Sequence, residues 1–240
     1  APASEDRVSG AQVIDGSLKF DSGSSNYLKR TNSSSGDRKT WTLSVWMKRN
    51  LSNATFFQSF FINRTNPGYN IRFDRNTSTE NYTYFGLGGG ALSGSRKFRD
   101  TGWFHAVLVY DTTNATEADR VKWYINGQRE ANWIAATYPS QNTDGEFNRN
   151  QEYGIGYYNT NTAWDGSMSQ YYFIDGQALT HDSFGFTDPL TNTWRPKKYT
   201  GTFTGTNTFY LPMDGNSPIG QDQSGQGNNW TPVNFGGSVA

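Results

Sequence analysis

The sequence predicts an all-β fold built from antiparallel strands. Short segments that alternate apolar and polar residues recur along the 240 residues, and turns rich in Gly, Ser, Thr and Asn separate them. The sequence has no periodic runs typical of long helices. In RVKWYINGQ (120–128), alternation runs into Asn126-Gly127, the strongest short-range signal for a β-hairpin. Regular strands and hairpins of this kind indicate a sandwich or a barrel.

The expected strands follow one another closely. In WTLSVWMKR, Trp41 begins a row of apolar residues on one side, while Trp46 and Lys48 lie on the more polar side. Residues 88–96, GGGALSGSR, form a loop that lacks the Gly-Lys-Ser/Thr of a phosphate-binding loop. A helical turn is expected at 176–185, with Thr180 or Asp182 as its N-cap. The expected strands are 17–20, 26–30, 41–49, 55–62, 69–73, 81–87, 103–111, 120–128, 153–158, 166–175 and 207–214.

We expect one domain over residues 15–240, preceded by a polar, irregular arm at residues 1–14. All-β sandwiches often reach this size as a single unit. Only 34% of the residues are hydrophobic, but 16% are aromatic. Each buried aromatic side chain removes roughly 150–250 Å² from water, so these rings can supply the core.

The composition argues against several classes of protein. The formal net charge is zero, so nucleic acid is not an expected partner. The lack of cysteine excludes disulfides and thiolate metal sites, and it fits assembly in a reducing cytoplasm. No apolar run approaches the ~18 residues of a membrane-spanning helix, so membrane insertion is not expected. The first ten residues lack the basic and apolar regions of a signal peptide.

Several motifs, taken in order, resemble those of laminin-G-like, concanavalin-A-like lectin domains. Their opening strands are similar to SLKFDSGSSNYLKR (17–30), and another of their strands is similar to WTLSVWMKR. Their central hairpin resembles WFHAVLVYDTT followed by RVKWYINGQ, and a later segment resembles residues 154–179. The resemblance extends to about residue 185. It implies a concanavalin-A-like jelly-roll sandwich of two antiparallel sheets.

One motif stands out of the family's order. The segment that opens many laminin-G-like domains resembles LPMD (211–214) and DQSGQGNNWT (222–231), which here lie near the C-terminal end. Either the domain is circularly permuted or a second domain has been cut short. We favour permutation, because the terminal strands of such sandwiches are adjacent and domains tolerate moved termini at neighbouring surface ends.

A narrower resemblance is to virion proteins of marine bacteriophages. It is carried by GDRKTWTLSVWMKR, YFIDGQALTHDSFG, WRPKKYTGT and DQSGQGNNWTPVNF. It implies a non-enzymatic protein at the virion surface, as a fibre, spike or capsid-decorating domain, assembled in the host cytoplasm. The implied partners are other virion proteins, further copies in a homo-oligomer, and host-surface glycans. Two alternatives stay open: a purely structural decoration or cement protein of capsid or tail, and a glycan depolymerase.

Catalysis would need a pair of carboxyl groups, as in the glucanases that share this fold. Retaining glycosidases hold them ~5–5.5 Å apart and inverting ones ~6.5–9.5 Å. The strand motif Glu-x-Asp-x-x-Glu of the related glucanases does not occur. Glu117 with Asp119, and Glu146 with Glu152, lie in expected loops, where they are solvated charges. His105 is expected to pack within its strand, so no catalytic residue is assigned.

Carbohydrate binding calls for exposed aromatic rings beside amides and carboxylates. A flat ring covers the apolar face of a sugar, while the polar groups bond its hydroxyls. Loops with this mixture contain Trp133, Tyr158, Trp164 and Asp165, which are the candidate carbohydrate-binding residues. For Trp164 a structural role competes, since it stands two residues before Gly166, where the family's aromatic ring usually packs inward.

Calcium is the metal that the sequence favours. Many laminin-G-like domains bind it, and its ligands are carboxylate, amide and backbone oxygens. Asp21, Asp165 and Asp222 are the candidate oxygen sources. The alternative is that they cap turns, because Asp before Gly or Ser does so without a metal. Zinc is disfavoured with two histidines and no cysteine, and no other cofactor is expected.

Overall fold

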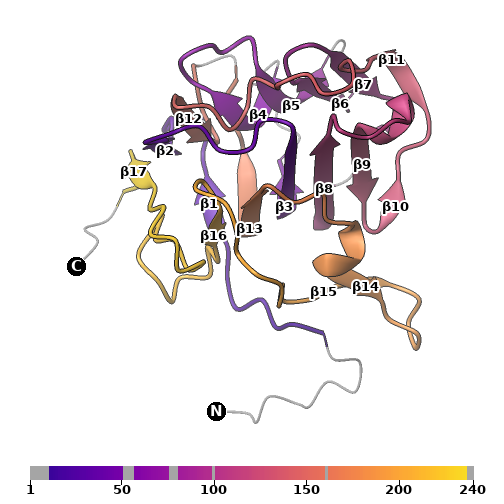
Figure 1. Ribbon diagram of the computed structural model, residues 1–240. Coiled ribbons are helices and arrows are strands. Elements are labelled where there is room, and N and C mark those ends of the chain that lie inside the picture. The colour runs from indigo at the N-terminus through magenta and orange to yellow at the C-terminus, as the bar shows by residue number, and fades with distance from the viewer. Residues whose placement is uncertain (1–10, 51–56, 76–80, 99–100, 160–161, 237–240) are drawn as a thin grey trace.

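The computed structural model describes residues 11–50, 57–75, 81–98, 101–159 and 162–236. Two large antiparallel sheets form two layers, and a small two-stranded sheet lies outside them (Figure 1). The predicted all-β jelly-roll sandwich is confirmed. Residues 1–10 of the expected arm and residues 55–56 of one expected strand lie outside the described residues.

The first sheet, sheet A, is built around the long strand β13. Its strands in spatial order are β1 (Leu18–Phe20), β13 (Gly166–Asp175), β3 (Thr40–Arg49), β8 (Phe104–Asp111), β9 (Val121–Ile125) and β10 (Gln128–Arg129), and β16 (Phe209–Leu211) also pairs with β13. The strands β9 and β10 form the predicted hairpin, with Asn126 at φ 48° and Gly127 at φ 75°. Positive φ at both turn residues is typical of a tight type I′ turn.

The second sheet, sheet B, has eight strands within the described residues. In spatial order they are β11 (Trp133–Thr137), β7 (Ala91–Gly94), β6 (Asn81–Gly86), β5 (Asn70–Arg75), β4 (Phe57–Asn63), β12 (Glu152–Ile155), β2 (Tyr27–Thr31) and β17 (Thr231–Val233). The strand β17 pairs with β2, and Trp230 beside it is buried in the core. The C-terminal segment thus packs into this sandwich.

The core between the sheets is aromatic. Trp41 stacks on Tyr110 at 5.1 Å and on Phe173 at 5.5 Å between ring centroids. The alternation predicted for β3 is confirmed, since one complete face of this strand is buried in the core: Trp41, Leu43, Val45 and Met47. The low apolar content is therefore offset by large rings, each of which buries a large area.

A second apolar cluster covers the outer face of sheet A. The segment after β13 folds back over this face through the one-turn 3-10 helix η2 (His181–Ser183), β14 (Gly185–Thr187) and β15 (Trp194–Pro196). Figure 1 shows η2, β14 and β15 below sheet A. Both faces of β8 are buried as a result, which explains its uninterrupted apolar run AVLVY. The buried members of this cluster are Val107, Val109, Tyr124, Tyr172, Ile174, Phe184, Tyr199 and Tyr210.

An irregularity divides β13 into two halves. The pairing of β13 with β3 shifts between Ser169 and Tyr172, and Gln170 there has φ 51°. Before the shift β13 pairs with β1, and after it with β16. This β-bulge re-aims the side chain of Gln170, as bulges commonly do near binding sites.

Several expectations need correction. The predicted loop 88–96 contains the strand β7, and β11 lies in a segment that was expected to be a loop. The helical turn is present as η2 with Thr180 at the N-cap position, but no side-chain bond caps it. The short one-turn helix η1 (Glu117–Asp119) lies in the turn before β9. These two short strands lack a clear alternating pattern, because pairing with neighbouring strands, rather than side-chain preference, stabilises them.

Candidate functional site

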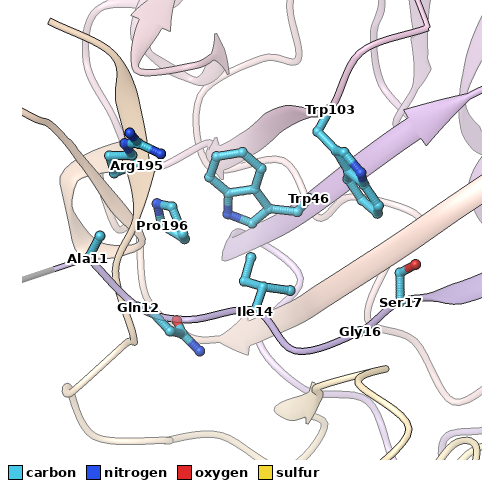
Figure 2. Close-up of a pocket in the computed structure, with 9 residues that line it drawn as sticks. All are labelled: Ala11, Gln12, Ile14, Gly16, Ser17, Trp46, Trp103, Arg195 and Pro196. Atoms are coloured by element: carbon cyan, nitrogen blue, oxygen red, sulfur yellow. The ribbon is translucent and has the colours of Figure 1, made fainter. Parts of the chain in front are cut away.

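An open cleft of about 430 Å³ lies between the N-terminal segment, sheet A and β15. Its walls come from parts of the chain that are far apart in the sequence: residues 11–17, Trp46 of β3, Trp103, and residues 195–196 of β15. Figure 2 shows Trp46 in the middle, with Trp103 on one side and Pro196 and Arg195 on the other. We call this the Trp46–Trp103 cleft.

The two indole rings are the main features of the cleft. Trp103 is 42% exposed, and Trp46 is partly exposed. Within the described part of the chain, neither indole nitrogen has a hydrogen-bond partner. Each ring therefore offers an apolar surface together with a free N–H donor. A ligand with apolar C–H faces and hydroxyl groups matches this combination.

The Trp46 ring is held from behind by His105. The two rings stack, with centroids 5.1 Å apart, and His105 stacks in turn on Trp194 at 6.0 Å. The indole N–H of Trp194 donates to Nδ1 of His105 over 3.0 Å. The proton of the neutral imidazole is therefore on Nε2, which lies 2.8 Å from the hydroxyl of Ser44. His105 is thus a positioning residue for Trp46.

Burial keeps His105 neutral. Its side chain is 1% exposed, and desolvation lowers its pKa to about 3, with a smaller contribution from the nearby His181. The bond from Trp194 acts in the same direction, because it occupies the nitrogen that a second proton would need. The packed histidine expected from the sequence is what the structure contains.

The position of Trp194 depends on two glycines. A Cβ atom at Gly127 would lie 2.4 Å from Cζ3 of Trp194, and one at Gly185 would lie 2.4 Å from its Cζ2. No side chain fits at either position without moving the indole. The Asn126-Gly127 turn thus helps to place Trp194, which orients His105 beneath Trp46.

Polar groups form the rim of the cleft. Gln12 is fixed at both ends: its backbone N–H donates to the carbonyl of Pro196 over 2.9 Å, and its Nε2 to Oε1 of Gln170 over 2.9 Å. Residues 11–14 of the expected arm therefore lie against the domain. The guanidinium of Arg195 is 3.7 Å from Asp188, and its side chain is 47% exposed.

Trp164, one of the predicted carbohydrate-binding residues, is in the core. Only 1% of it is exposed, and its ring contacts Phe60 and Phe73 at 6.1 and 5.9 Å between centroids. Its ring is not available to a sugar, so its assignment as a sugar contact is wrong. The competing structural role is the one that the structure shows.

The other three predicted residues lie apart from the Trp46–Trp103 cleft. Trp133 lies in the edge strand β11, partly buried against Phe85. Tyr158 follows β12, which four strands of sheet B separate from β11, and it lies 5.8 Å from the guanidinium of Arg64. Asp165 precedes β13, and its carboxylate accepts a bond from Asn50. The structure therefore brings these residues to different places.

The three predicted calcium ligands do not fit a shared site. The carboxylate of Asp21 accepts bonds from Ser24 and Gly23, which lower its pKa. That of Asp222 accepts bonds from the backbone N–H groups of Tyr210, Ser224 and Asn228 and from the Ser224 hydroxyl. In the described residues, no group of three or more His, Asp or Glu side chains could hold a metal ion. Turn capping accounts for Asp21 and Asp222.

Three of the four acidic residues considered for catalysis are engaged in ion pairs within the described residues. Asp119 binds Arg129 at 2.7 Å, and Glu152 binds Arg64 at 2.8 Å. Glu146 lies between Arg149 and Arg38. Asp119 and Glu152 keep 35% and 36% of their side-chain surface exposed, and Glu117 is exposed, so these three remain partly or fully solvated as expected. Glu146 is the most covered of the four, at 20% exposure.

Sequence reasoning missed both indoles of the cleft. Trp46 stands on the polar face of an alternating strand, and such an outward tryptophan was a usable signal. The alternation could not indicate which residues form the opposite wall of the cleft, because residues 11–17 and β15 come from distant parts of the chain.

A known protein family and several solved structures are similar to this chain. No curated protein matches the sequence. A sequence profile of the laminin G-like type, described as the concanavalin A-like lectin/glucanases superfamily, matches residues 22–183. The chain belongs to this superfamily. Within the described residues, no helix is long and apolar enough to cross a membrane.

Two solved structures have a similar fold. A protein of Bacteroides ovatus ATCC 8483, described as a candidate carbohydrate-binding protein, is 16% identical with a TM-score of 0.62, over 92% of this chain and 58% of its own. The chain thus spans just over half the length of that protein. A heptameric SAP-like pentraxin of Limulus polyphemus is 13% identical with a TM-score of 0.50, over 71% of this chain and 80% of its own. At such identities the likeness concerns the fold.

Proposed function

We propose that the chain is a non-enzymatic glycan-binding module and that the Trp46–Trp103 cleft is its binding site. The observation that carries the proposal is the pair of indole rings, each with an unpaired N–H, in one open cleft. A pyranose ring can lie on the exposed face of Trp103, and its hydroxyls can reach Gln12 and Arg195 at the rim.

The biological setting that we propose is the surface of a phage particle. The support is the resemblance of four sequence segments to virion proteins of marine bacteriophages. In this setting the module would sit on a fibre, a spike or the capsid and attach the particle to host-surface glycans. Several copies would raise the overall affinity even where one cleft binds weakly.

The test is a binding measurement on an array of neutral and acidic oligosaccharides with the wild type, Trp103→Ala and Ile134→Ala. Losing one indole contact should weaken binding about 10- to 100-fold. Ile134 is 55% exposed in β11, so it is a matched surface control that should leave binding unchanged. If the wild type binds no saccharide, or if Trp103→Ala binds as well as the wild type, the proposal is overturned.

Two further measurements separate the alternatives. A depolymerase would release new reducing ends from the bound glycan, and we expect none. A decoration protein would attach stoichiometrically to particles without binding host cells. We expect saturable binding of the labelled protein to host cells, with competition by unlabelled protein.

A further inference from the structure

A second hollow, of about 490 Å³, lies next to the Trp46–Trp103 cleft. The N-terminal segment separates the two: Ile14 and Gly16 line the cleft, Val13 and Asp15 line the hollow, and Gln12 lines both. Alternate residues of an extended chain face opposite sides, so this segment forms a shared wall. We call this space the Gln170 hollow, after the side chain described next.

Gln170 presents an unpaired donor in this hollow. Its side chain is only 4% exposed, and its Oε1 accepts bonds from Nε2 of Gln12 at 2.9 Å, the Tyr210 hydroxyl at 2.6 Å and the Tyr172 hydroxyl at 3.4 Å. Burial raises the pKa of both tyrosines, so their hydroxyls stay protonated and donate. The amide Nε2 of Gln170 has no partner in the described part of the chain. This nitrogen is not among the fully buried polar atoms, so it faces solvent in the hollow, where an acceptor of a ligand can replace water.

The hollow is lined with aromatic rings. Tyr172 and Tyr210 stack at 4.2 Å with planes 4° apart, and Phe203 is nearly parallel to Tyr210 at 6.4 Å. Tyr199 packs against the same group. Tyr172 and Tyr210 are only 2% and 8% exposed, so their stacked faces are closed to a ligand. Phe203 is partly exposed and supplies the ring surface that the apolar C–H face of a sugar can contact.

The charges around the hollow select the type of sugar. Asp15 and Asp214 bring two carboxylates and Lys198 brings one ammonium group. The excess of negative charge disfavours an anionic ligand. A hydroxyl group both donates and accepts, so it can bond to a carboxylate and to the Gln170 amide at once.

We propose that the Gln170 hollow is a second saccharide subsite and that it takes a neutral sugar residue. This rests on the proposed glycan-binding function, because the hollow shares Gln12 and the wall 12–16 with the first site. The amide of Gln170 donates to a ring or hydroxyl oxygen, and Asp15 accepts from a hydroxyl group.

The test is a ¹⁵N–¹H NMR titration of the whole chain with D-glucose, D-galactose and D-mannose, each added as a separate probe. The side-chain amide signals of Gln170, assigned by their loss in Gln170→Glu, report on the hollow, and the indole signal of Trp103 reports on the cleft. We expect the Gln170 signals to move with at least one of the three sugars. In Asp15→Asn, the half-saturating concentration for Gln170 should rise at least threefold, while that for Trp103 stays the same.

The two proposals fail in different ways. If the Trp103 signal moves and the Gln170 signals stay fixed with all three sugars, the second subsite is overturned and the first stands. If neither signal moves, both are overturned. Glucuronate is the anionic probe: if it moves the Gln170 signals at lower concentration than the neutral sugars do, the selection for neutral sugars is wrong. Since Asp15 is exposed, its substitution tests the hollow even if Gln170→Glu does not fold.

Discussion

Trp194 donates its indole N–H to Nδ1 of His105, and this 3.0 Å bond links the β14–β15 hairpin to the floor of the Trp46–Trp103 cleft. His105 lies between the rings of Trp194 and Trp46. Protonating His105 would place two N–H groups against each other and a charge in a buried site. The arrangement is therefore stable only with a neutral imidazole, which makes it sensitive to acid.

The first prediction concerns pH. The pKa of His105 is about 3 in the folded protein, against 6.5 for an ordinary histidine. Between these values the unfolded chain binds a proton that the folded chain does not. The His105 contribution to the free energy of unfolding should be constant above about pH 6.5 and fall by up to ~1.4 kcal/mol per pH unit below it. Urea titrations at several pH values measure this slope.

The control for this prediction uses both histidines of the chain. His105→Gln should lose most of the slope between pH 5 and pH 6.5, whereas His181→Gln should keep it, because burial is the largest cause of the lowered pKa. An unchanged slope in His105→Gln would show that another group is responsible.

The second prediction concerns the turn below Trp194. Gly127→Ala puts a Cβ atom 2.4 Å from the indole at a residue with φ 75°, so it combines backbone strain with displacement of Trp194. Gly215 has φ 80° but nothing within 4 Å of a Cβ, so Gly215→Ala carries the backbone strain alone. We expect a loss of about 1 kcal/mol for Gly215→Ala and about 2–4 kcal/mol for Gly127→Ala. Denaturant unfolding gives both values, and equal losses would contradict the Trp194 contact.

The core could be predicted from the sequence, whereas the cleft could not, for a physical reason. Alternation in residues 41–49 reports which side chains face the core, and Trp41 lies there as predicted. It does not report what covers the other face. That depends on residues 11–17 and on β14 and β15, whose contacts are long-range. Composition alone placed Trp164 and Trp133 in polar loops, although both pack against the core.

The third prediction concerns Asp222. Asp222→Ala removes the acceptor of four hydrogen bonds, two of which come from the buried backbone N–H groups of Tyr210 and Asn228. We expect it to lower the free energy of unfolding by about 2–4 kcal/mol. Since these bonds occupy the carboxylate, the loss should be the same in calcium chloride and in EDTA. A calcium-dependent rise of the wild-type Tm that Asp222→Ala abolishes would instead support the calcium site that the sequence allows.

The last prediction separates stability from binding with two tryptophans. Trp164 is buried between Phe60 and Phe73, so Trp164→Phe leaves a cavity and should lower the free energy of unfolding by about 1–3 kcal/mol. Because its ring never reaches the surface, glycan affinity should stay within twofold of the wild type. Trp103 is 42% exposed, so Trp103→Phe should change stability by less than about 0.5 kcal/mol while weakening glycan binding, since it loses the indole N–H and part of the ring face. Calorimetric titration and urea unfolding of both variants measure the two effects. If Trp164→Phe weakened glycan binding while Trp103→Phe did not, the binding site would lie near Trp164 and not in the Trp46–Trp103 cleft.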